Sequence, residues 1–338
     1  MIKIFRQLRA NLLGKGQISG YLLYALGEIV LVMIGILLAL QINNANELRK
    51  NERIVDSILK QIHSELAVDI GRTTDIIAYY HRKDSLIHLI LSEELSAADY
   101  QIENHYPLTT VAVTINVLNI QTEGFQNLMN ASERLSTRYD SILLDLKDLY
   151  IDDKAIVDLN MEYLKKNIEG YLNWLKLNTS WFSEVYFTDR PLSEERIAFY
   201  LRNPTYRNVL TEQHFIGVTN HCMSVIQFRQ SAIAVYEKLG AFLQLETPPP
   251  YATTDYADYP GTFHDDSDTL RISLLNDKLI LEAYEEGQID TMEIVPLTDR
   301  KFAAENGGFC YLRSDSTQRV TGLTIRQGSV NFDLKKMD

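Results

Sequence analysis

The hydrophobic and polar positions divide the chain into three parts with different periodicities. In the first part, Tyr21 to Leu40, twenty residues include one charged side chain, Glu28. The run from Ile29 to Leu40 is apolar throughout and includes one glycine. Because about twenty apolar residues are the length that a helix needs to cross a bilayer, we expect a transmembrane helix over residues 21–42.

A cleaved signal peptide is the main alternative for this run. Signal peptides have a short basic segment, an uninterrupted apolar core and a small-x-small cleavage site. Here twenty residues precede the run, Glu28 interrupts it, and no small-x-small site follows in residues 39–44. A buried core helix is also disfavoured, because the run is apolar all round whereas the other helical patterns are amphipathic. The sequence therefore favours an uncleaved anchor.

The orientation of this anchor is predicted from the length of chain on each side. Basic residues precede the span with no acidic residue among them, but those that follow it are mixed with acids, so the charge bias is small. Only twenty residues lie before the span, whereas about three hundred follow it. We expect a single-pass protein of a bacterial inner membrane, with residues 1–20 as a cytoplasmic basic segment and the bulk of the chain in the periplasm.

The second part, residues 43–246, has a helical pattern. One amphipathic stripe continues from the span without a breaker and consists of Leu59, Ile62, Leu66, Ile70, Ile77 and Tyr80. Further helices are expected over 85–95, 123–129, 133–149, 152–178, 193–201 and 205–245. The β-branched segment 111–120 could be extended. An antiparallel α-helical bundle is the economical outcome, and a coiled-coil dimer is less favoured because no heptad persists.

The third part begins after a proline-rich linker at 247–258. Pro248, Pro249 and Pro250 stop the last helix, and the pattern then changes to alternation of apolar and polar residues. About eight short strands in eighty residues predict a small antiparallel β-barrel over 259–338. The expected fold is therefore a membrane-anchored multidomain chain with an N-terminal transmembrane helix, an all-α helical bundle and a C-terminal small antiparallel β-barrel.

Two resemblances support this architecture. The first fifty residues resemble the N-terminus of bacterial single-pass membrane proteins of domain-of-unknown-function family 6090, through the stretches MIKIFRQLRANLLGKGQISGYLLYAL and GEIVLVMIGILLALQINN. The helical region resembles the same family more loosely, through TEGFQNLMNASERL. The segments YPGTF, LRISLLNDKLILEAYEEG, IVPLTDRKF and VTGLTIRQG are similar to small lipocalin-like domains. The family has no assigned reaction, so the resemblance implies membrane topology and architecture.

Composition narrows the classes of partner. The net charge of −12 opposes a phosphate backbone and disfavours nucleic-acid binding. The segment from Tyr251 onward carries sixteen acidic and nine basic residues, which disfavours an anionic ligand of the barrel. The two cysteines, Cys222 and Cys310, cannot form a disulfide scaffold. We expect two buried free thiols, and a single disulfide that joins the barrel to the bundle is the open alternative.

Candidate functional residues lie within the span. Glu28, Gly35 and Ile42 are spaced seven apart and share one helix face, and Gly35 and Ala39 form a small-xxx-small pair beside it. Small residues let helices approach closely, so Glu28, Gly35 and Ala39 are expected to mediate membrane-helix packing or coupling. Interfacial placement or ion pairing of Glu28 remains open, as does proton or ion coupling.

Other constellations give weaker signals. Ser57 and Lys60 match Ser-x-x-Lys, with Tyr171 as a further group, but no Lys-Thr-Gly strand is present. The histidine pairs 81/88 and 214/221 are each seven apart, about 10 Å along one helix, which is too far for one ion. The acidic run 264–268 lacks the glycine and terminal glutamate of a calcium loop, and a solvated hairpin turn is expected.

These observations predict a non-catalytic, membrane-anchored periplasmic binding or assembly protein without cofactor or metal. Its expected partners are the lipid bilayer and either further copies of the chain in a homo-oligomer or a partner membrane protein. Two alternatives stay open: a small-ligand sensor that uses the C-terminal barrel, and a subunit of an ion-coupled membrane complex that uses Glu28.

Overall fold

The computed structural model describes residues 18–101, 105–131, 135–186, 191–245, 259–275, 278–285, 288–298, 300–304, 308–317, 319–327 and 330–337. Two expected segments, the basic residues before position 18 and the linker 247–258, lie outside the described residues.

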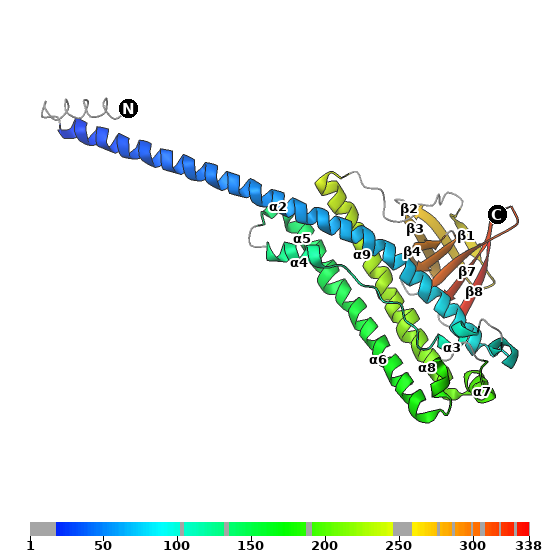
Figure 1. Ribbon diagram of the computed structural model, residues 1–338. Helices are drawn as coiled ribbons and strands as arrows, with labels where there is room; N and C mark the ends of the chain where they lie inside the picture. Colours follow the sequence, from blue (N-terminus) through cyan, green and yellow to red (C-terminus); the bar gives the residue numbers. More distant parts are fainter. Residues whose placement is uncertain are drawn as a thin grey trace.

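One helix, α2 (Ile18–Leu91), connects the apolar run to the bundle and extends from it as a long rod (Figure 1). Its residues from 25 to 50 are largely exposed, whereas the expected stripe from Leu59 to Tyr80 is buried. This continuity is the predicted one. The expectation of a separate helix over 85–95 is wrong: α2 continues to Leu91, and no proline or glycine lies between Gly71 and that end.

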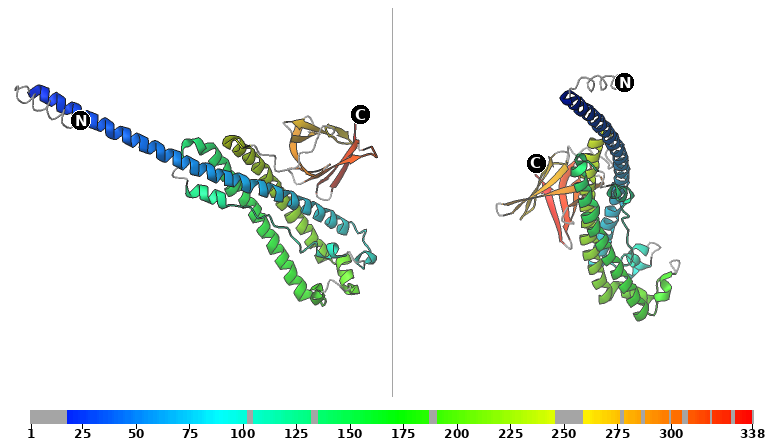
Figure 2. Two further views of the ribbon diagram at one scale, coloured as in Figure 1. Left: turned by 45° about the horizontal axis from the view of Figure 1, so that its top comes forward. Right: turned by 90° about the vertical axis from the view of Figure 1, so that its left-hand side faces the viewer.

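The bundle is formed by α2 and the helices that follow it. α9 packs along α2, and α6 packs on α9 (Figures 1 and 2). The elements are η1 (Ala97–Tyr100), α3 (Tyr106–Thr110), α4 (Glu123–Asn130), η3 (Thr137–Tyr139), α5 (Asp140–Lys147), η4 (Asp148–Asp153), α6 (Lys154–Asn178), η5 (Phe182–Tyr186), α7 (Glu194–Arg202), α8 (Pro204–Gln213), η6 (His214–His221) and α9 (Cys222–Leu243).

One expected helix contains turns with a wider hydrogen-bond spacing, and similar turns join the helices expected over 133–149 and 152–178, which are therefore continuous. The helix expected over 205–245 is present as α8, η6 and α9, and η6 is a π-helix. A second π-helix, η4, lies between α5 and α6. A single period of 3.6 residues cannot predict such turns, because each inserts an additional residue into the helical repeat.

The segment 114–122 between α3 and α4 has no helical or strand structure. Side chains of α2 provide the hydrogen bonds that a neighbouring strand would otherwise supply. Lys83 Nζ donates to the carbonyl of Thr114 at 2.9 Å, and Asp69 Oδ2 accepts from the amide of Gln121 at 2.8 Å. These hydrogen bonds hold the segment along α2, and residues 114–122 do not pair in a sheet.

The C-terminal part is a closed antiparallel barrel in which each strand pairs with the next and β1 pairs with β8. Its strands are β1 (Gly261–His264), β2 (Thr269–Leu275), β3 (Lys278–Glu285), β4 (Gln288–Thr298), β5 (Lys301–Ala304), β6 (Phe309–Ser314), β7 (Val320–Gln327) and β8 (Val330–Lys336). The predicted eight-stranded barrel is therefore confirmed. Large side chains, including Phe263, Phe302 and Leu323, pack together as its own hydrophobic core.

The barrel packs against the bundle beside the C-terminal half of α2 (Figures 1 and 2). Alternation along the strands sends one set of side chains into the barrel and the other set outward. Val295, Ala303 and Phe309 belong to the outward set, are buried, and join the hydrophobic core of the bundle. The outer face of β4, β5 and β6 is therefore an interface between the two parts.

Gly124 lets the start of α4 pack closely against α2. A Cβ added there would lie 2.7 Å from Ile62 Cγ1 and 3.2 Å from the Ile62 backbone nitrogen. Gly124→Ala should therefore lower the free energy of unfolding by about 1–3 kcal/mol, measured by denaturant titration. Gly170→Ala is the control, because nothing lies within 4 Å of its added Cβ and alanine favours a helix. A loss of stability at position 170 as large as at 124 would contradict the packing argument.

Candidate functional site

The span residues singled out from the sequence lie on the exposed part of α2. Glu28, Gly35 and Ala39 come from one helix without a break, so their expected common face is present. A Cβ added at Gly35 would meet no described atom within 4 Å. Among the described residues, none therefore packs against this face at Gly35, and the role of the face as a packing surface stays a prediction.

A polar region lies where the barrel meets α2. The Tyr311 hydroxyl of β6 is hydrogen-bonded to His81 Nε2, and the Phe309 ring packs edge-on against the His81 imidazole at 4.8 Å between centroids. Arg326 of β7 donates to Asp84 Oδ2 at 3.3 Å and to Ser85 Oγ at 3.2 Å. These contacts, together with the outward face of β4 to β6, form the region that we refer to as the junction.

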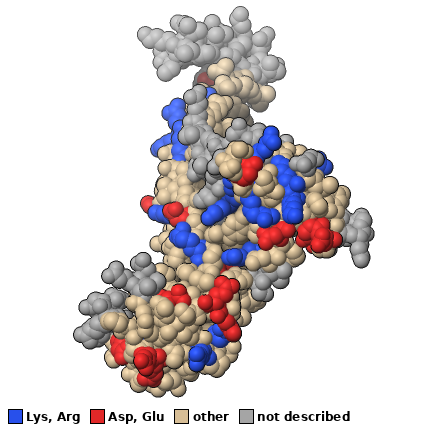
Figure 3. Space-filling model, turned by 90° about the vertical axis from the view of Figure 1, so that its right-hand side faces the viewer, with Lys and Arg blue, Asp and Glu red and all other residues tan. Residues whose placement is uncertain are grey.

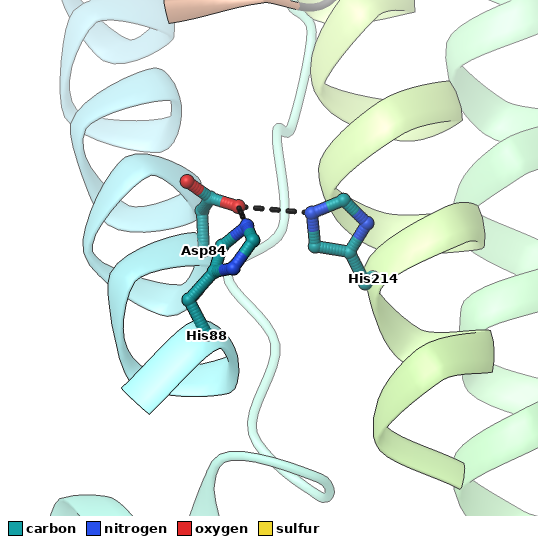
Figure 4. Close-up of side chains that lie close together, drawn as sticks. All are labelled: Asp84, His88 and His214. Atoms are coloured by element: carbon teal, nitrogen blue, oxygen red, sulfur yellow. Dashed lines mark hydrogen bonds and ion pairs between the residues drawn. The ribbon is translucent and has the colours of Figure 1, made fainter. Parts of the chain in front are cut away.

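At the same place, two histidines converge on Asp84 (Figure 4). Asp84 and His88 are four residues apart on α2 and therefore share a face, with His88 Nε2 at 3.6 Å from Asp84 Oδ1. His214 reaches the same oxygen from the facing helix, with its Nε2 at 2.9 Å. The three ligand atoms all lie within 4.8 Å of one another. This arrangement of one carboxylate and two imidazoles is typical of a transition-metal site.

His214 reaches α2 because α8 and η6 both pack against that helix. His214 is the first residue of the π-helix η6, which follows directly on α8. Such wide turns are frequent at functional sites, and this one changes the facing of the residues after His214 relative to a regular α-helix. At the other end of η6, His221 is fully buried against Tyr80, with ring centroids 5.2 Å apart.

Burial and neighbouring cations favour the neutral forms of the groups around this cluster. Burial lowers the pKa of His81 to about 4, and the charge of Lys301 contributes in the same direction. Burial also lowers the pKa of Lys83 to about 7; its ammonium donates to Gln213 Oε1 at 3.0 Å. The Tyr311 hydroxyl stays protonated, because burial raises its pKa to about 12. The junction is thus a desolvated polar interface.

A cleft of about 670 Å³ opens next to the junction, between α2, α3 and the start of β5. Tyr79, Tyr106 and Val111 contribute apolar wall, and Arg82 and Lys301 contribute positive charge. Figure 3 shows Lys and Arg side chains gathered on the barrel side of the molecule, with Asp and Glu mainly towards the margin and the lower end. The excess of acidic residues after position 250 therefore does not make this face uniformly negative.

The structure places the remaining candidates apart. Ser57 and Lys60 are exposed on α2, whereas Tyr171 is buried in α6. The acidic run 264–268 forms the turn between β1 and β2, where Asp265 Oδ1 accepts the amides of Ser267 and Asp268, as expected for a hairpin.

The two thiols are free and buried, as predicted. Burial raises the pKa of both, that of Cys310 to about 12.

The convergence of Asp84, His88 and His214 was missed from the sequence. The two histidine pairs were tested within single helices, and each pair spans about 10 Å, so neither pair can bind one ion. The structure instead combines one histidine from each pair with an aspartate. The Asp84 and His88 spacing of four was a visible signal, but position 214 is 130 residues from Asp84, and only helix packing brings it close.

Buried His221 gives the protein an acid-labile core. Burial, with a contribution from the Lys83 charge, lowers its pKa from 6.5 to about 4. The stabilisation is complete above pH 6.5 and is lost as pH falls towards 4, because the unfolded chain then binds a proton that the folded protein excludes. When the pH is lowered from 7 to 5, the free energy of unfolding should fall by about 2 kcal/mol because of His221. Denaturant titrations at both pH values should show a smaller pH dependence for His221→Phe; an equal dependence would contradict this assignment.

Comparisons with known proteins give one match. The family described as "Family of unknown function (DUF6090)" matches residues 28–168, which include the apolar part of α2, the α2 side of the junction and most of α6. No curated protein and no solved structure matches the chain. The match agrees with the resemblance noted for the N-terminal region and carries no activity. His214 and the barrel lie beyond the matched residues.

Proposed function

We propose that the protein is a non-catalytic, single-pass anchored assembly protein of a bacterial inner membrane, with its bundle and barrel in the periplasm. One observation carries this proposal. The same helix that forms the centre of the bundle continues as an apolar segment whose side chains are exposed to the surroundings. An 18-residue window of this helix has a mean hydropathy of 2.4 with none of it buried, so water is an unsuitable environment for it.

The continuity of α2 supports an anchor that is mechanically coupled to the folded part. The helix crosses from the exposed apolar side chains to buried Val55 and Leu59 without a break. Any association of the spans would therefore fix the spacing and orientation of the attached bundles. This coupling is what an assembly role requires, and the Gly35 and Ala39 face is the surface that we assign to it.

The barrel also supports assembly over ligand sensing. Its inward side chains pack on one another, and Phe263, Phe302 and Leu334 are each at most 1% exposed. A lipocalin-like sensor would need an open apolar interior. We therefore assign the barrel a structural role, docked on the bundle by its outer face.

A fusion experiment tests the orientation. Alkaline phosphatase joined after Leu245 should be active in a bacterial host, because it folds in the periplasm. A fluorescent reporter that folds only in the cytoplasm should stay dark at the same position. Fusions after Asn46 serve as the matched pair, since this position lies just beyond the proposed span. The opposite pair of results would overturn the proposed topology.

Small-ligand binding is the second candidate, and the cleft beside the junction favours it. Its volume of about 670 Å³ is in the usual range for ligand pockets, and Arg82 and Lys301 suit a carboxylate with an apolar body. Medium-chain fatty acids should then raise the melting temperature of the wild type and leave that of Lys301→Glu unchanged. The absence of any shift in the wild type would remove this candidate.

A further inference from the structure

We infer that Asp84, His88 and His214 bind a transition-metal dication, of which Zn²⁺ is the suitable probe. The site would join α2 to η6 and, through the second oxygen of Asp84, would contact the barrel. This inference is independent of the anchor, because all three residues lie in the folded part of the chain.

The distances fit one ion with a small adjustment. Tetrahedral zinc with bonds of about 2.0–2.1 Å places its ligand atoms about 3.3 Å apart. Asp84 Oδ1 lies 2.9 Å from His214 Nε2 and 3.6 Å from His88 Nε2, on either side of that value. The three ligand atoms lie within 4.8 Å, so side-chain rotations alone can bring them around one ion.

The two oxygens of Asp84 have separate surroundings. Oδ1 faces both histidines, whereas Oδ2 accepts the Arg326 guanidinium at 3.3 Å. One oxygen is thus held by a cation from the barrel while the other is directed at the imidazoles. Partners of this kind orient the ligands of metal sites and fix their geometry. Arg326 therefore acts as a positioning residue for Asp84.

The two histidines of the cluster are more exposed to solvent than the aspartate. The Asp84 side chain is 2% exposed, whereas those of His88 and His214 are 24% and 16% exposed. An ion can therefore reach the histidines from outside and meet the carboxylate at the base of the site. Three protein ligands leave one position for water, as in metal sites that exchange ligands.

The donor set selects the class of metal. Two imidazole nitrogens and one carboxylate oxygen suit zinc and its neighbours in the first transition series, whereas Mg²⁺ and Ca²⁺ prefer oxygen donors. Since the ligands come from two helices, the bound ion would cross-link residues 130 positions apart in the chain. Zinc should therefore also raise the melting temperature of the full chain.

Zinc titration of the purified full chain in detergent, in competition with a chromogenic chelator, tests this inference. We expect one zinc per chain. Loss of an outer-sphere partner commonly weakens metal affinity 10–100-fold, so removing a direct ligand by Asp84→Asn or His214→Gln should weaken it at least about a hundredfold. His264→Gln removes an exposed histidine elsewhere and should leave the affinity unchanged.

The outcomes that overturn the inference are distinct. A folded wild type that binds no zinc would show that the cluster is hydrogen-bonded only. Zinc binding that persists in Asp84→Asn and His214→Gln would place the ion elsewhere. If the variants fail to fold, X-ray absorption of the zinc-loaded wild type decides: two imidazoles with oxygen are expected, and a sulfur ligand or the absence of imidazole would overturn the site. None of these results depends on membrane topology.

Discussion

A form of the chain that begins at Asn46 is expected to be water-soluble, whereas the full chain should sediment with membranes and resist extraction at high salt and alkaline pH. The change should be nearly complete, because the deletion removes the exposed apolar segment and leaves the buried core, which starts at Val55. Fractionation of cells that express the two forms, followed by immunoblotting, measures the effect.

A point substitution in the full chain tests the apolar segment without shortening the protein. Arginine at a helix centre costs about 2.5–3.5 kcal/mol of insertion free energy, so Ile34→Arg should reduce membrane insertion strongly. Leu48→Arg introduces the same charge on the exposed part of α2 beyond the apolar run and should have little effect. A full chain that is soluble without treatment, or one whose insertion both substitutions reduce equally, would contradict the anchor.

Phe309→Asp is expected to detach the barrel from the bundle while the barrel itself stays folded. The Phe309 ring is 2% exposed and packs on His81, so removing it should cost about 3–5 kcal/mol, and burying a carboxylate there adds to the cost. The side chains inside the barrel are untouched by this change. Small-angle X-ray scattering of the form that begins at Asn46 should show a larger maximum dimension, with an unchanged β-sheet signal in circular dichroism.

Ile289→Asp is the matched control for this substitution. Ile289 lies on β4 and is 57% exposed, so the same carboxylate should leave the scattering curve unchanged. A compact Phe309→Asp protein with wild-type stability would show that the junction contributes little to holding the two parts together. Loss of all β-sheet signal would instead show that the barrel cannot fold without its contacts to the bundle.

Local patterns in the sequence were sufficient for the order of the three parts, but not for every element within the bundle: α3 was missed, and the end of α2 was taken for a separate helix. The unbroken periodicity from the apolar run to Tyr80 predicted one continuous helix, and the change to alternation after the prolines predicted the barrel. Alternation also marks which residues face outward, but it does not reveal that three of them, Val295, Ala303 and Phe309, are covered by the bundle. That contact depends on how two separate units dock, which periodicity within either unit does not encode.

The candidate site was less accessible from sequence for a related reason. Spacing arguments compare residues on one element, and on that basis the four histidines at 81, 88, 214 and 221 could not share an ion. The structure separates them into different roles: His221 is enclosed in the core, His81 bonds the barrel, and His88 and His214 meet at Asp84. This meeting depends on the packing of η6 against α2, which joins positions 130 residues apart and leaves no signal in local spacing.

Disulfide cross-linking within native membranes tests the central claim, that the span is an assembly surface, most directly. At about 100° per residue, Val32 lies on the face of Glu28, Gly35 and Ala39, and Leu37 lies on the opposite face. The native thiols of Cys222 and Cys310 are buried and should not compete. Val32→Cys should form a covalent dimer under mild oxidation, Leu37→Cys should not, and adding Gly35→Leu should abolish the Val32→Cys product. Equal cross-linking from both faces, or monomer only, would contradict the account.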